Sequence, residues 1–321
     1  PPNPRFMFTK ITTASYNPEA TCPTFNQFLD QIFPDPELKE FVLDLLGYCL
    51  IGGNPLRLFV VFYGEGANGK STLSEVVKFC LGSYATEINP NTFMLKKTQL
   101  PGAPRPDLAK LPGVRLVFAS ETHQAHRLDE PFIKMLTGRD EIVARHLYGK
   151  NEFTFRPQFT PILKTNFKPL ARGEDKAFWD RVVLVPFEKR FSEEERDPYL
   201  LEKLKEEAEG ILTLLVKRAQ KYLQEGRLKK PEKIKKATEE YRAEADPLYR
   251  FFTENLEEAP GEEISAKELY NAYVSWCKEE GEEVATQTKF GKFLLNLGIK
   301  KIKKRNANYY KGIRLKDNLP F

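Results

Sequence analysis

The stretch FYGEGANGKST, residues 62–72, decides how this sequence folds. It fits the pattern G-x-x-x-x-G-K-[ST], in which Gly69 is followed by Lys70 and Ser71. Glycines let the backbone turn tightly, so that several N–H groups point at one anion. A lysine at this position reaches the outer phosphates of a nucleotide, and the hydroxyl after it can hold Mg²⁺. The predicted phosphate-binding residues are Gly64, Glu65, Gly66, Ala67, Asn68, Gly69, Lys70, Ser71 and Thr72.

The flanks of this stretch predict a buried strand before it and a helix after it. Residues 56–63, LRLFVVFY, are almost all apolar, as in strands buried on both faces of a sheet. In STLSEVVKFCLG, apolar residues recur at helical spacing from Leu73 to Cys80, and Gly82 suits a helix end. Strand, loop and helix is the order that a phosphate-binding loop requires. The alternative is a chance match in a glycine-rich turn.

Composition narrows the class of protein. The chain of 321 residues is 41% hydrophobic and 30% charged, as in a soluble protein of two or three domains. It has no apolar run of about 18 residues and no signal peptide, so we expect a cytoplasmic protein without a membrane partner. Four cysteines without a CxxC pair favour neither a zinc site nor disulfides. Because the chain opens on PPNPRF without a methionine, we expect a piece of a longer protein.

Charge is unevenly distributed along the chain. The net charge is +5, yet residues 286–316 contain ten Lys or Arg and no Asp or Glu. The rest of the chain therefore carries about five net negative charges. The pattern indicates a basic C-terminal region on a mildly acidic body.

Further apolar runs predict an α/β fold with a mostly parallel sheet. These runs are GVRLVFASE (113–121), FTPILKTN (159–166) and DRVVLVPF (180–187). Residues 140–157 alternate along both arms of a hairpin, with Gly149 at the turn. Residues 197–226 predict one long helix that starts at Asp197.

The ends of the chain are helical, and a basic hairpin follows the last helix. Asp35 and Pro36 start a helix near the N-terminus. Ser265 and Glu268 form a capping box, TKFGKFLLNLG continues as a second helix, and IKKIKKRNANYYKGIRLK predicts two strands, an order typical of a winged helix. We expect a helical domain at 1–53, an α/β domain at 54–245 and a basic winged-helix-like domain at 246–321.

The order of these motifs resembles the superfamily 3 helicases, a branch of the AAA+ P-loop ATPases. GEGANGKST, RLVFASE, IKMLTGRDEIVAR, ILKTN and FWDRVVLVPF look like the phage and plasmid primase-helicase ATPases, which are related to the poxvirus primase-helicase. The resemblance covers residues 20–195 strongly and the C-terminal segment weakly. It implies a homo-oligomeric, usually hexameric ring that hydrolyses ATP with Mg²⁺ and moves along single-stranded DNA. A primase domain upstream is a further expectation.

The resemblance implies two residues that act on the attacking water. Glu121 follows a buried strand, where a carboxylate can bind Mg²⁺ and polarise water; the alternative is an ordinary surface acid. The family often has two acids here, whereas this chain has Ser120 before Glu121. Asn166 matches the sensor asparagine that holds the same water, although an asparagine also suits a turn at this point.

The resemblance also implies basic residues at a catalytic site that two subunits share. Arg181 matches an arginine finger, which would stabilise charge in the transition state of a neighbouring subunit; a structural ion pair is the alternative, and Arg172 is a nearby competitor. Lys134 and Arg145 lie where the family places basic residues near the site, or are solvated surface cations.

The hairpin at 140–157 matches the loop that this family threads into the pore of the ring. Lys150 would grip a phosphate, and His146 or Tyr148 would touch a sugar or base. An ordinary exposed turn is the equal alternative.

The basic C-terminal region is the second candidate for DNA binding, here of forked DNA. Tyr309 and Tyr310 would be available for stacking on bases. The alternative is a set of solvated lysines on a domain that packs against the ring. The candidate residues are Lys289, Lys292, Lys300, Lys301, Lys303, Lys304 and Arg305.

These features favour an ATP-dependent DNA helicase in the replication of a phage, plasmid or similar element. A replication initiator or loader that uses ATP only as an assembly switch is the first alternative, because binding and hydrolysis use the same loop. A P-loop phosphotransferase is the second, but the hairpin, the late arginine and the basic region argue against it.

Overall fold

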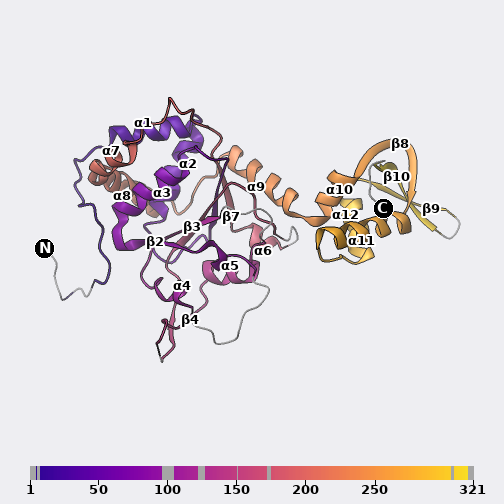
Figure 1. Cartoon of the computed structure of the whole chain (residues 1–321), viewed down its shortest axis with the longest axis horizontal. Helices are drawn as coiled ribbons and strands as arrows, with labels where there is room; N and C mark the ends of the chain where they lie inside the picture. Colours follow the sequence, from indigo (N-terminus) through magenta and orange to yellow (C-terminus); the bar gives the residue numbers. More distant parts are fainter. Residues whose placement is uncertain are drawn as a thin grey trace. The chain divides into compact units, whose positions relative to one another are not determined.

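The computed structural model describes residue 5 and residues 8–95, 105–121, 127–149, 151–171, 175–304 and 307–316. Contacts divide the chain into two compact units, and the second unit begins at Arg242. Figure 1 draws the first unit in indigo to orange and the second in orange to yellow. Within the described ranges, every helix is too short or too polar to cross a bilayer.

Five parallel strands form the sheet of the first unit, in the order β2-β3-β6-β1-β7. Their bounds are β1 (Phe59–Tyr63), β2 (Ala85–Ile88), β3 (Leu116–Glu121), β6 (Thr160–Thr165) and β7 (Val182–Pro186). The prediction of an α/β fold with a mostly parallel sheet is confirmed, and all four predicted apolar runs contain strands. Strand β2 was not predicted, because ATEI is short and half polar; it is held by its pairing with β3.

Helices surround this sheet, and a short hairpin projects from it. The helices are α1 (Pro23–Ile32), α2 (Pro36–Tyr48), α3 (Lys70–Leu81), α4 (Pro106–Ala109), α5 (Glu130–Thr137), α6 (Lys176–Trp179), α7 (Leu200–Glu206), α8 (Ala208–Glu225) and α9 (Glu232–Ala245), with 3-10 turns at Gly82–Tyr84 and Pro90–Thr92. The predicted hairpin is present as the antiparallel pair β4 (Ile142–Ala144) and β5 (Phe153–Phe155).

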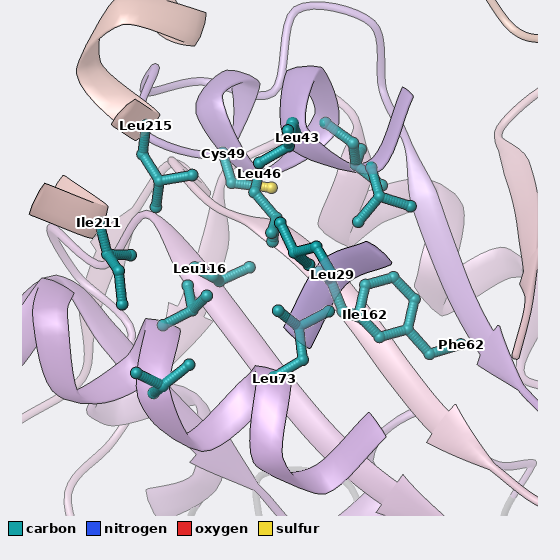
Figure 2. Packing of buried hydrophobic residues seen from close by; sticks show 14 of the residues in the cluster. Leu29, Leu43, Leu46, Cys49, Phe62, Leu73, Leu116, Ile162, Ile211 and Leu215 are labelled. Carbon is teal, nitrogen blue, oxygen red and sulfur yellow. The ribbon is translucent and has the colours of Figure 1, made fainter. Parts of the chain in front are cut away.

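One hydrophobic core joins the N-terminal helices to the sheet. Figure 2 shows side chains from α1, α2, α3 and α8 meeting those of β1, β3 and β6. The labelled members are Leu29, Leu43, Leu46, Cys49, Phe62, Leu73, Leu116, Ile162, Ile211 and Leu215. The predicted helical domain 1–53 therefore shares its core with the α/β part. The domain bounds at 53 and 245 stay predictions.

The long helix predicted for residues 197–226 is wrong, because the structure divides it into α7 and α8 at Glu207. The Glu207 carboxylate accepts hydrogen bonds from the backbone N–H groups of Thr24 and Phe25, both at 2.9 Å. These are among the unpaired N–H groups of the first turn of α1, whose N-cap residue Cys22 makes no side-chain cap. The residue at the break between α7 and α8 thus caps the N-terminus of α1.

The second unit contains α10 (Pro247–Asn255), β8 (Leu256–Ser265), α11 (Ala266–Glu280), α12 (Gln287–Asn296), β9 (Lys300–Lys304) and β10 (Ala307–Leu315). Its sheet is antiparallel in the order β8-β10-β9. The two helices and the basic hairpin are confirmed, and Ser265 caps α11 as predicted. Strand β8 was not predicted, because Pro260 and Gly261 within it are typical of a turn; an edge strand tolerates both.

Candidate functional site

The glycine-rich loop connects β1 to α3, as predicted, and neighbouring atoms pack closely against two of its glycines. A Cβ atom at Gly64 would lie 2.3 Å from the carbonyl oxygen of Phe187. A Cβ atom at Gly69 would lie 2.6 Å from Ile32 Cγ2, and the φ of Gly69 is +86°. Both positions therefore require glycine. Between them Glu65, Gly66 and Ala67 are exposed, so the loop presents its backbone to solvent.

Asn68 holds the loop in shape from the inside. It is 4% exposed, and its Nδ2 donates to the carbonyl oxygens of Glu65 at 2.5 Å and Phe187 at 3.3 Å. Its Oδ1 accepts from the backbone N–H of Lys70 at 3.4 Å and from the Lys70 ammonium at 3.2 Å. The sequence assigned Asn68 to the phosphate-binding loop, and the structure adds an internal bracing role.

Lys70 is a buried cation among neutral oxygens. Its Nζ donates to the carbonyl oxygen of Gly64, to Asn68 Oδ1 and, at 3.2 Å, to Asn166 Oδ1. Burial lowers the pKa of Lys70 to about 8. An ionised phosphate would supply a negative partner, and a negative partner favours the protonated form of the lysine. Ser71 is exposed beside Lys70 in the first turn of α3, whereas Thr72 is half-buried.

The carboxyl ends of three neighbouring strands meet at this loop. Thr165 pairs with both Tyr63 and Glu121, and its carbonyl oxygen accepts from the N–H of Gly64 at 3.3 Å. Asn166, one residue on, is half-buried and contacts Lys70. The backbone of Glu121 lies at the same edge, but its side chain is outside the described part. The structure thus brings together the loop, Asn166 and the end of β3.

These residues fit a nucleotide with Mg²⁺. The loop backbone is open to solvent at a helix N-terminus, which suits phosphate. A hydroxyl on Ser71 and the strand end at Glu121 would supply the oxygen donors that Mg²⁺ prefers.

A pocket of about 360 Å³ opens beside the loop. Its wall includes Tyr63, Gly64, Glu65, Phe187, Lys189 and Arg190. The sequence did not indicate this pocket, because Lys189 and Arg190 follow β7 and come to β1 only through strand pairing.

Arg181 lies where β7 begins, at the amino ends of the parallel strands, whereas the loop follows their carboxyl ends. Its carbonyl oxygen accepts from the N–H of Phe59, at the start of β1, and β1 and β7 run parallel. The loop begins at the other end of β1, roughly 16 Å away at about 3.3 Å per residue. The guanidinium of Arg181 donates to Ala177, and its Nε has no hydrogen-bond partner within the described ranges. The structure does not bring Arg181 to the loop of its own chain; Arg172 lies outside the described residues.

Lys134 is also away from the loop. It forms an ion pair with Asp175, which caps α6 through the N–H of Phe178 at 3.1 Å. Arg145 is half-buried just after β4. Neither residue contacts Lys70 in the interactions that the structure records.

At the hairpin, the ring of His146 stacks on Phe153 with centroids 5.1 Å apart. Tyr148 is 94% exposed and has a φ of +65°, which is uncommon for a bulky residue. Lys150 lies outside the described residues. The hairpin tip therefore presents an aromatic ring to solvent.

The basic residues of the second unit are partly neutralised by β8. Lys304 forms an ion pair with Glu263, and Arg314 pairs with Glu257 at 2.5 Å. Sequence counting missed this, because the acids lie outside 286–316. Six of the candidates are described and exposed: Lys289, Lys292, Lys300, Lys301, Lys303 and Lys304. Arg305 lies outside the description.

The expected role of Tyr310 in base stacking is wrong, because Tyr310 is 2% exposed and belongs to the core of the second unit. Tyr309 is half-buried, and the Lys304 ammonium lies 5.9 Å from its ring centroid. Alternation along β10 puts neighbouring residues on opposite faces, so only one of the two tyrosines faces outward.

Two segments of the chain match known families. Residues 243–319 match the family described as "Poxvirus D5 protein-like", and residues 1–34 match "D5 N terminal like". A protein of Acanthamoeba polyphaga mimivirus named "Putative helicase" is 32% identical over 279 residues, which cover 81% of this chain and 29% of that protein. A "Putative helicase" of Frog virus 3 is 28% identical over 266 residues, with 78% and 27% covered.

A "Putative primase" of African swine fever virus is 25% identical over 295 residues, with 85% of this chain and 30% of that protein covered. The chain thus spans less than a third of the length of the curated relatives it matches. Among solved structures, the apo structure of the NrS-1 C-terminal region has a TM-score of 0.56 at 13% identity, with 96% of this chain and 80% of that chain covered. This likeness shows the fold alone.

Proposed function

We propose that this chain, which carries a poxvirus D5 protein-like domain and is related to viral proteins named as helicases and primases, is the ATP-driven motor of a DNA replication helicase. The observation that carries the proposal is the convergence of Lys70, Asn166 and the end of β3 on one exposed loop. We assign the first unit to the AAA+ superfamily 3 ATPases and the second to the winged helices.

In this proposal, Lys70 and the loop N–H groups hold the phosphates. Ser71 and Glu121 hold Mg²⁺, which would neutralise charge on the phosphates during transfer. The Asn166 amide orients the attacking water. Lys70 already contacts Asn166, so phosphate binding and water positioning are linked through one hydrogen bond. The pocket beside Tyr63 is of a size to take the base and ribose.

Arg181 would complete the site of a neighbouring subunit. It cannot do so within its own chain, because it lies at the far edge of the sheet. Its half-exposed guanidinium is held at the end of α6 by the carbonyl of Ala177. A ring of identical subunits, of which a hexamer is the expected form, would place each Arg181 against the next loop.

Contacts to DNA would come from both units. The exposed Tyr148 could stack on a base of single-stranded DNA, as aromatic side chains do without regard to sequence. The exposed lysines of α12 and β9 would contact phosphates of forked DNA. Because β8 neutralises Lys304, we assign phosphate binding chiefly to Lys292, Lys300, Lys301 and Lys303.

A strand-displacement assay on a synthetic fork tests this function. We expect displacement with ATP, none with a non-hydrolysable analogue, and none for Lys70→Ala. Fork binding and assembly with the analogue, but no displacement with ATP, would instead show a loader that uses ATP as a switch. Transfer of phosphate to a small acceptor by a monomer would show a phosphotransferase.

A further inference from the structure

An ion pair between a buried lysine and a half-buried glutamate lies beneath α3, next to the loop but outside the residues assigned above. Lys164 in β6 is 8% exposed, and its Nζ lies 3.2 Å from Glu87 Oε1 in β2. Lysine is almost never this buried unless it is paired. The sequence held one signal, a lysine inside the apolar run FTPILKTN, but Glu87 could not be connected to it without knowledge of β2.

Lys164 reaches the first turn of α3 through one intermediate. Its Nζ donates to Ser74 Oγ at 3.1 Å, and Ser74 Oγ donates to the carbonyl oxygen of Ser71 at 2.9 Å. Ser74 is 2% exposed, so solvent does not compete for these bonds. The position of Ser71, the proposed Mg²⁺ ligand of this helix, therefore depends on a charge buried in the sheet.

Glu87 reaches the other proposed Mg²⁺ ligand in the same way. Its carboxylate accepts from Ser120 Oγ at 2.8 Å, and Ser120 directly precedes Glu121 at the end of β3. Burial alone would raise the pKa of Glu87, but the Ser120 hydroxyl and the ammonium groups of Lys164 and Lys78 lower it to about 2. The carboxylate is therefore charged at every pH at which the protein would work.

Stability alone does not explain such a pair. Desolvation of two charges commonly offsets their attraction, and apolar replacements of similar volume are often as stable. What the pair adds is fixed geometry, because both partners must stay within hydrogen-bond reach. Here that geometry links β2 and β6, which carry the pair, to α3 with Ser71 and to β3 with Glu121.

We propose that Lys164 and Glu87 form a positioning pair for the metal–nucleotide complex: through Ser74 and Ser120 they fix the two groups that bind Mg²⁺. The inference rests on the proposed function, since it needs Mg²⁺·ATP at this loop. Within the described residues the interactions of the pair include neither the loop nor Lys70, so in this proposal it acts through other residues and takes no part in the chemistry.

The test is a Mg²⁺ titration of the binding of a fluorescent ATP analogue, with a parallel measurement in EDTA. For Lys164→Met we expect the Mg²⁺ concentration for half-saturation to rise by about tenfold or more, as when partners of metal ligands are removed. Nucleotide affinity in EDTA should stay within about threefold of wild type, because the loop and Lys70 are untouched. Ser74→Ala, which leaves the pair intact, should shift the titration in the same direction.

Two variants separate positioning from stability. Lys78→Met removes a cation that contacts Glu87 at 3.1 Å but not Ser74, and it should leave the Mg²⁺ response unchanged. The double variant Lys164→Met with Glu87→Gln removes both charges of the pair, so its unfolding temperature should be no lower than that of Lys164→Met while the Mg²⁺ defect remains. Recovery of the Mg²⁺ response together with stability would overturn the proposal.

The experiment distinguishes a failure of the proposed function from a failure of the positioning pair alone. If wild type shows no Mg²⁺-dependent nucleotide binding, the proposed function fails and the inference with it. If wild type responds to Mg²⁺ and both Lys164→Met and Ser74→Ala match it, only the positioning pair is refuted.

Discussion

Lys70 is the residue on which the proposed nucleotide site depends. Among the side chains that the structure describes, which exclude that of Glu121, its ammonium has neutral oxygens as partners, and burial lowers its pKa to about 8 from an ordinary 10.5. The folded protein therefore holds Lys70 in a state that an incoming phosphate would improve. This is the arrangement expected of a binding residue, since a purely structural lysine would be paired with an acid.

The lowered pKa predicts a pH dependence of nucleotide affinity. Above pH 8 free Lys70 loses its proton, and binding must restore it, so the dissociation constant should rise by up to about tenfold per pH unit. Lys70→Arg, which stays charged, should remove this dependence. Fluorescence titrations between pH 7 and 10 measure it, and equal slopes for both proteins would contradict the account.

The lowered pKa of Lys70 has the opposite effect on the free energy of unfolding, which should increase with pH. Between pH 8 and 10.5 the unfolded chain binds more protons at Lys70 than the folded one does. Stability of the nucleotide-free protein should therefore gain from this residue as pH rises through that window.

Asn166 and Asn68 are predicted to differ in their kinetic effects. Asn166→Ala should lower turnover by about 100-fold with little change in ATP affinity, because we propose that its amide orients the attacking water. Asn68→Ala should chiefly weaken affinity, because Asn68 braces the loop. Steady-state ATPase kinetics with independent binding measurements distinguish the two, and an equal loss of affinity in both variants would count against the roles assigned.

At the residue scale, sequence patterns indicated the positions of those residues that are fixed by their neighbours along the chain. Lys70 and Gly69 belong to a contiguous motif, and the structure holds them as the motif requires. Tyr310 and the Lys164–Glu87 pair could not be assigned, because they depend on which residues lie across a strand or on a neighbouring one.

At the scale of elements, buried parallel strands were predictable because they are continuous apolar runs. Strands β2 and β8 were not, since pairing alone makes them strands. The helical spacing of apolar residues continues through Glu207 and predicted one helix there. In the structure α7 ends and α8 begins at this residue. In each case a tertiary contact decided the local conformation.

The cap that Glu207 provides predicts a loss of stability on its removal. Glu207→Ala leaves the N–H groups of Thr24 and Phe25 without their charged acceptor and should cost about 1–3 kcal/mol in the free energy of unfolding. Glu206→Ala, at an exposed neighbouring position, should change it by less than about 0.5 kcal/mol. Urea unfolding measures both, and equal effects would show that the cap contributes nothing.

At the scale of the whole molecule, the N-terminal helices and the sheet form one core, whereas the second unit has a core of its own. Composition predicted a basic C-terminal region, but the acidic strand β8 was needed to see how much of its charge is paired. We propose that Arg181 acts beyond its own chain, because the glycine-rich loop of the same chain lies at the other end of β1.

The central claim is therefore a nucleotide site shared between subunits, and ATP turnover per chain tests it most directly. Turnover should be measured over a range of protein concentrations, with and without single-stranded DNA, for wild type and Arg181→Ala. Arg227→Ala, which removes an exposed arginine outside the hairpin and the proposed site, is the matched control.

We predict that wild-type turnover per chain rises steeply with concentration and is stimulated by DNA. It should collapse for Arg181→Ala and persist for Arg227→Ala. Turnover that is independent of concentration, of DNA and of Arg181 would contradict the shared site and with it the ring motor.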